Sequence, residues 1–152
     1  FTHYRLWLEK HKFNSEDFCI DGSGTLAAFG IRDVRDLDFL YSGKGSPETG
    51  FKEIDCHNNE NQHENLSPDE IVNNPDNYFY YEGCKFVSIE LIKALKQKRN
   101  EVKDQHDVKS IQAILRGQKV KEPFVSKLNK ILSSQYIKSK IKLSLLKMKR
   151  LC

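Results

Sequence analysis

Residues 18–40 read FCIDGSGTLAAFGIRDVRDLDFL, and this stretch decides the fold that we expect. It opens with a short apolar run, passes through Gly-Ser-Gly at residues 22–24 into a second apolar run, and ends on an Asp-Leu-Asp triplet embedded in apolar residues. Short apolar runs bounded by glycines and charged residues are typical of strands and helices that pack into a core. The pattern predicts a strand over 18–21, a helix over 25–29 and a second strand over 36–41.

Asp36 and Asp38 of the triplet are unusual for a buried strand. Side chains two residues apart on a strand point to the same face, so the two carboxylates would lie side by side. Unpaired carboxylates repel each other and are costly to bury. A divalent cation removes both costs, and carboxylates together with substrate phosphates suit Mg²⁺. The alternative is that Arg32 and Arg35 pair with the aspartates on a solvated edge strand.

The Gly22-Ser23-Gly24 turn has the features of a phosphate-binding loop. It joins an expected strand to an expected helix. Glycines let the backbone approach a ligand closely, and the first N–H groups of a helix have no partner within the helix. The same turn could serve the fold alone, so its role depends on which side chains stand near it.

A third carboxylate is expected from the next strand, residues 51–57, which read FKEIDCH. Alternation along this strand puts Glu53, Asp55 and His57 on one face. Asp55 is the favoured third member of the aspartate group, and Glu53 is its substitute.

Hydrophobic spacing and turn signals predict the remaining elements. The expected elements are helices over residues 3–12, 88–99 and 103–116, a hairpin of strands 78–81 and 85–87, and a polar loop over 57–77. Short strands interleaved with helices and followed by helices alone indicate an α+β fold. We therefore expect a small mixed sheet with flanking helices and a helical C-terminal part.

Charge divides the 152-residue chain into two parts. Residues 119–152 carry ten Lys or Arg and one acid, a net +9, whereas residues 1–118 carry 15 basic and 20 acidic residues, a net −5. We expect a folded domain over 1–118 and a basic amphipathic helical tail over 119–152. The tail either packs on the acidic domain, which we favour, or makes peripheral contact with an anionic membrane. Its two aromatic residues, Phe124 and Tyr136, are too few to favour nucleic acid.

The four cysteines stand singly, without the C-x-x-C spacing of a metal site. Isolated cysteines favour reduced thiols, and no apolar run approaches the roughly 18 residues that a membrane span needs. These observations predict a soluble, cytoplasmic protein.

The motif order resembles the nucleotidyltransferase superfamily of the DNA polymerase beta type: Gly22-Ser23, twelve residues, Asp36-Leu37-Asp38, and then Asp55. The helix SIELIKALKQKR at 88–99 and the K-D-x-x-D run after it are similar to antibiotic nucleotidyltransferases and AbiEii-type toxin domains. GTLAAFGIRDVRDLDFL is also similar to the LicD and fukutin group, which moves phosphocholine or polyol phosphate from CDP-linked donors onto glycans. Together these similarities span roughly residues 18 to 115.

The resemblance implies a magnesium-dependent transferase with a nucleotidyltransferase-like fold. Its donor would be a nucleoside triphosphate or a CDP-linked compound, and its acceptor a hydroxyl on a small molecule or glycan. Asp36 and Asp38 would hold Mg²⁺, Gly22 and Ser23 would bind the outer phosphates, and Asp55 would hold a second ion and activate the acceptor.

Two alternatives stay open. The first is a LicD-like phosphotransferase module of a larger surface-polysaccharide enzyme, with which a chain that begins at Phe1 is compatible. The second is a non-catalytic nucleotide-binding or scaffold domain of the same fold. Metal-dependent turnover distinguishes the second alternative from a transferase.

Two further groups of charged residues are less specific. Lys103, Asp104 and Asp107 are typical of a helix start with local ion pairs, although Lys103 or Arg99 could reach donor phosphates. The polar loop holds two histidines and two glutamates, His57, His63, Glu60 and Glu64, which lack the fixed spacing that a metal site favours.

Overall fold

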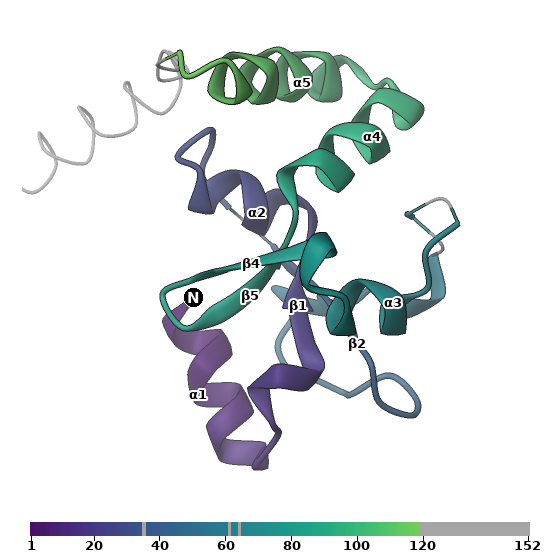
Figure 1. Ribbon diagram of the computed structural model, residues 1–152. Coiled ribbons are helices and arrows are strands. Elements are labelled where there is room, and N and C mark those ends of the chain that lie inside the picture. The colour runs from purple at the N-terminus through teal and green to yellow at the C-terminus, as the bar shows by residue number, and fades with distance from the viewer. Residues whose placement is uncertain (35, 61, 64, 119–152) are drawn as a thin grey trace, which may run out of the picture. The chain divides into compact units, whose positions relative to one another are not determined.

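The computed structural model describes residues 1–34, 36–60, 62–63 and 65–118 (Figure 1). All of them fall in one compact unit, Phe1–Val120. The basic tail expected over 119–152, like Arg35 and Glu64, lies outside the described residues. Among the helices of the described part, none combines the length and the apolar character that crossing a membrane requires.

A five-stranded mixed sheet forms the centre of the unit, in the order β3-β2-β1-β5-β4. The strands are β1 (Phe18–Ile20), β2 (Leu37–Tyr41), β3 (Ile54–Cys56), β4 (Tyr78–Tyr81) and β5 (Cys84–Val87). β1 runs antiparallel to β2 and parallel to β5, β2 runs parallel to β3, and β4 and β5 form an antiparallel hairpin. The expected α+β class with a small mixed sheet and flanking helices is confirmed.

Helices cover both faces of this sheet. They are α1 (Thr2–His11), α2 (Gly22–Ala28), α3 (Pro68–Asn73), α4 (Ile89–Arg99) and α5 (Val102–Leu115). Tyr4, Trp7 and Leu8 of α1 pack in one core cluster, which includes Phe39 of β2. The opposite cluster contains Leu40 of β2 and is built by residues of the other four helices, namely Leu26, Ile71, Val72, Ile89, Ile92 and Ile111.

The helix after the first strand begins earlier than the sequence predicted. We expected it over 25–29 with Gly-Ser-Gly as a preceding turn, but α2 starts at Gly22. The reason is Asp21, whose side chain accepts a hydrogen bond from the Gly22 N–H and caps the helix directly after β1. The Gly-Ser-Gly segment is therefore the first turn of the helix.

The polar segment predicted as a loop over 57–77 contains a helix, α3. Its start is fixed by a capping box: the Glu70 N–H donates to Ser67 Oγ, and the Glu70 carboxylate accepts from the Ser67 N–H. Ile71 and Val72 are then buried against the sheet. The preceding strand is also shorter than the expected 51–57, because β3 covers only Ile54–Cys56.

The hairpin and the last two helices match the prediction. Glu82 and Gly83 join β4 to β5, both with positive φ, as a tight hairpin turn requires. Ser88 caps α4 through the Leu91 N–H, and Figure 1 shows α4 leading from the end of β5 toward α5. The α4 and α5 helices pack against each other and carry the long-range ion pairs described below.

Candidate functional site

The aspartates predicted as metal ligands gather at the start of the β2–β3 pair. Asp38 and Asp55 are direct partners in the parallel register, so their side chains leave the same face of the sheet. Asp36 stands immediately before β2 and is exposed. Glu53, the substitute for Asp55, lies outside β3, and its carbonyl accepts the Leu37 N–H at 2.7 Å. The register therefore favours Asp55.

The two residues predicted to bind phosphate border these carboxylates. Gly22 has a φ of +55°, and a Cβ there would stand 3.2 Å from Asp38 Oδ2. The Ser23 hydroxyl donates to the carbonyl oxygen of Asp36 at 3.0 Å. The first turn of α2 therefore lies against the aspartates, and only glycine fits at position 22 without strain.

Asp38 is electrostatically the most perturbed member of the group. Its side chain is 23% exposed. Burial, opposed by His57 and aided by the negative charges of Asp21, Asp36 and Asp55, raises its pKa from 3.8 to about 6. A carboxyl with this pKa is protonated below about pH 6 and mostly ionised at pH 7, where a bound cation would compensate its charge. Perturbation of this kind is common at functional sites.

His57 lies beside Asp38 and is held by two side chains of the following loop. Its Nε2 is 3.4 Å from Asp38 Oδ1 and 3.8 Å from Glu60 Oε1. The Gln62 side-chain nitrogen lies 2.9 Å from His57 Nδ1. An amide nitrogen can only donate, so Nδ1 accepts and a neutral imidazole carries its proton on Nε2, toward Asp38. His57 therefore presents an N–H to the carboxylate group.

A second histidine and carboxylate lie behind the group, in the core. Asp21 is fully buried, and His63 Nε2 lies 3.1 and 3.0 Å from its two oxygens. Asp21 also accepts the Gly22 N–H at 2.6 Å, and its own N–H donates to the Asp38 carbonyl at 2.8 Å. This pair ties the loop after β3 to the start of α2.

Sequence reasoning missed the part played by these histidines. Alternation along the expected strand 51–57 did place His57 on the face of Asp55, but it gave His57 no role beside Asp38. His63 was placed in a polar loop with little prospect of metal binding. No local pattern pairs His63 with Asp21, because they are 42 residues apart in the chain.

The basic residues near the end of α4 are engaged in ion pairs. Asp104 is fully buried and accepts from Lys96 Nζ at 3.0 Å and from Arg99 Nε and Nη2 at 2.7 Å each. Lys96 also lies 2.8 Å from Asp107, which pairs with Arg32 at 3.2 Å. The K-D-x-x-D run is a helix start with ion pairs, as its sequence indicated, and Asp104 and Asp107 also join α5 to α4.

The carboxylates are the candidate metal ligands of the site. Over the described ranges, no three His, Cys, Asp or Glu side chains already form a metal-binding group. Mg²⁺ needs fewer protein ligands than that, because it is usually held by one or two carboxylates with waters and substrate phosphates. The raised pKa of Asp38 among neighbouring carboxylates fits such an ion.

Comparison of the chain with protein-family models, with curated proteins and with solved structures gives no match. The interpretation of the site therefore depends on the residues and their geometry. The decisive features are the register of Asp38 with Asp55 and the approach of Gly22 to the Asp38 carboxylate.

Proposed function

We propose that the protein is a magnesium-dependent transferase with a nucleotidyltransferase-like fold. It moves a nucleotidyl or phospho-substituent from a nucleotide donor, either a nucleoside triphosphate or a CDP-linked compound, to a hydroxyl of a small molecule or glycan. The observation that carries this proposal is the convergence of Asp38, Asp55 and Gly22 at one end of two parallel strands.

The order of elements also supports the proposal. A strand leads into a helix that begins with Gly22 and Ser23, the next strand carries Asp38, and its parallel neighbour carries Asp55. This is the order that the resemblance to nucleotidyltransferases implies. A degenerate domain of the same fold would have no need to keep a half-buried Asp38 with a pKa of about 6.

The roles of the side chains follow from their positions. Asp36, Asp38 and Asp55 would hold Mg²⁺, which when bound neutralises charge on the donor phosphates. In nucleotidyl transfer the acceptor oxygen bonds to the α-phosphorus, while the bond from that phosphorus to pyrophosphate breaks. Asp55 is exposed and adjacent to Asp38, so we assign it to receive the hydroxyl proton. His57 orients Asp38 through its Nε2–H.

The test is thermal melting of the full chain with Mg²⁺ and each of the four nucleoside triphosphates in turn. We expect one nucleotide to raise the melting temperature only when Mg²⁺ is present, because binding to the folded state stabilises it. The Asp36→Ala/Asp38→Ala variant should lose that rise. The control variant is Asp76→Ala, which removes an exposed carboxylate on a separate 3₁₀ turn, Pro75–Asn77, and should keep it.

The outcomes separate the alternatives. A rise with a CDP-linked donor and with no triphosphate assigns the LicD-like reaction, and product analysis then identifies the transferred group. A nucleotide-dependent rise without turnover on any acceptor supports a binding domain. Equal melting of wild type and double variant with every donor overturns the proposal.

A further inference from the structure

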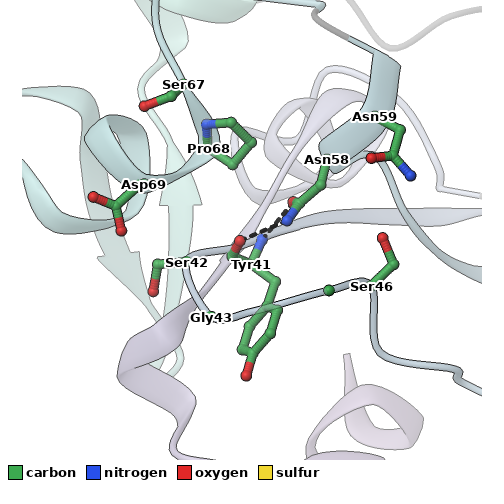
Figure 2. Close-up of a pocket in the computed structure, with 10 residues that line it drawn as sticks. Tyr41, Ser42, Gly43, Ser46, Asn58, Asn59, Ser67, Pro68 and Asp69 are labelled. Atoms are coloured by element: carbon green, nitrogen blue, oxygen red, sulfur yellow. Dashed lines mark hydrogen bonds between the residues drawn. The ribbon is translucent and has the colours of Figure 1, made fainter.

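A polar cavity of about 510 Å³ lies at the far end of β2 from Asp36 (Figure 2). Its ten lining residues are Tyr41, Ser42, Gly43, Gly45, Ser46, Asn58, Asn59, Ser67, Pro68 and Asp69. Figure 2 shows Ser67, Pro68 and Asp69 on one side, and Ser46 and Asn59 on the other. The volume falls in the range of about 300–1,000 Å³ that small-molecule sites occupy.

The chain links this cavity directly to the carboxylate group. Within β2, the distance along the strand from Asp38 to Tyr41 is roughly 10 Å. Alongside it, the chain of β3 continues from Asp55 to Asn58, whose side-chain oxygen accepts the Tyr41 N–H at 2.8 Å and whose amide nitrogen donates to the Tyr41 carbonyl at 2.6 Å. The two sites thus lie at opposite ends of one strand pair.

Several polar groups of the cavity are available to a ligand. Within the described part of the chain, the side chains of Ser46 and Asn59 form no hydrogen bond. Asp69 Oδ1 accepts one bond, from Asn73 at 2.9 Å, and a carboxylate has capacity for more. The Ser46 hydroxyl and the Asn59 amide can donate to and accept from alcohol groups, and the Asp69 carboxylate can accept from them.

The charge of the lining selects the class of ligand. None of the ten lining residues is Lys, Arg or His, and Asp69 disfavours an anion. Three serines and two asparagines suit a ligand that offers several hydroxyls. We propose that this cavity binds a neutral polyhydroxylated molecule, a sugar or an alditol, through Ser46, Asn59 and Asp69.

In the proposed transferase, this cavity would be the subsite that binds the acceptor, and this role rests on the proposed function. A sugar held here lies at the end of the strand pair that carries Asp38 and Asp55, so an acceptor must extend roughly 10 Å along β2 to bring a hydroxyl to the aspartates. The binding itself does not depend on metal or donor and can be measured without either.

The test is a titration of the ¹⁵N-labelled full chain, free of metal and nucleotide, followed by amide chemical shifts. The probes are glucose, galactose, mannitol and myo-inositol, with glucose 6-phosphate as the anionic comparison. We expect one or more neutral probes to shift the amides of residues 41–46 and 58–59 with millimolar affinity, and the phosphate to bind more weakly. Ser46→Ala/Asn59→Ala should weaken binding by about tenfold, as the loss of two hydrogen bonds predicts.

Two controls make the result specific. Gln97→Ala removes an exposed amide on α4, which lines a different cavity, and should leave sugar binding unchanged. Asp36→Ala/Asp38→Ala should also keep sugar binding while losing the effect of Mg²⁺ and nucleotide. The absence of shifts at these amides with every neutral probe, or stronger binding of the phosphate, overturns the cavity assignment. A nucleotide effect without sugar binding supports the transferase proposal and overturns the sugar subsite. Sugar binding without a nucleotide effect supports the sugar subsite and overturns the transferase proposal.

Discussion

Asp38 is a single residue of the candidate site whose charged form lowers the stability of the folded chain. Its pKa of about 6, against an ordinary 3.8, means that ionising it costs more in the folded chain than in the unfolded chain. The difference corresponds to about 3 kcal/mol once the carboxyl is fully charged. A bound cation would offset this cost, which is the physical reason to place one here.

Asp38→Asn should therefore stabilise the protein at alkaline pH. We expect the free energy of unfolding to rise by about 2–3 kcal/mol at pH 8 and by much less at pH 4, where the wild-type carboxyl is already protonated. Denaturant unfolding at both pH values measures the change. Asp33→Asn, at an exposed carboxylate, is the control. A loss of stability at pH 8 would mean that the His57 contact outweighs the cost of burial.

Gly24 has a packing role distinct from that of Gly22. A Cβ at Gly24 would stand 2.4 Å from Ile20 Cγ2, and Ile20 is fully buried in β1. Gly24→Ala should therefore push α2 off the sheet and cost about 1–3 kcal/mol. Urea unfolding measures this loss of stability. The comparison variant is Ser23→Ala, which loses one hydrogen bond and should cost about 1 kcal/mol. Equal midpoints for wild type and Gly24→Ala would show that α2 shifts freely.

At the scale of elements, local signals predicted most of the fold. Ser88 before an apolar-periodic run and Glu82-Gly83 between two strands each specify their structure within a few residues. The sequence SPDE at 67–70 carries an equally local helix signal, but the polar composition around it favoured a loop. The start of α2 was misplaced because Asp21 acts as a cap and not as the last residue of the strand.

Some features of the candidate site also follow from local patterns, whereas others depend on how the chain folds. Alternation, a local property, predicts that Asp36 and Asp38 share a face, whereas the pairing of β2 with β3 brings Asp38 next to Asp55. The pairing of His63 with Asp21 depends on how the loop after β3 returns over α2, and no spacing within the sequence encodes that path. For the same reason the polar cavity, whose walls come from three separate segments, has no linear motif.

The α4–α5 pair depends on a buried ion pair network. Asp104→Ala would remove the buried carboxylate that Lys96, which is 4% exposed, shares with Arg99 and would leave Lys96 with Asp107 alone, so we expect a loss of about 3 kcal/mol. Lys96→Met/Asp104→Leu should recover part of this loss, because two apolar groups replace the buried pair while Asp107 keeps Arg32 as its partner. Calorimetry of both variants tests this, with Lys109→Ala, at an exposed residue of α5, as the control. A double variant no more stable than Asp104→Ala would contradict the account.

At the scale of the whole molecule, Asp38 and Asp104 impose opposite pH dependences. Hydrogen bonds from Arg99 hold the pKa of Asp104 well below its usual range, so its stabilisation is present above about pH 4 and is lost as the pH falls further. Burial raises the pKa of Asp38 to about 6, so the folded chain is more stable while this carboxyl is protonated. That stability is fully present below about pH 4 and is lost as the pH rises through 6.

Stability should accordingly be greatest near pH 4, fall as the pH rises from 4 to 6, and change little more between pH 6 and 8. Unfolding free energies measured across this range locate the maximum. In Asp38→Asn the decline from pH 4 to 6 should flatten, and saturating Mg²⁺ should flatten it in wild type as well, because an ion on the carboxylates removes the cost of charging them. If Mg²⁺ leaves the wild-type profile unchanged while Asp38→Asn flattens it, the strain at Asp38 is real but a metal is not what relieves it.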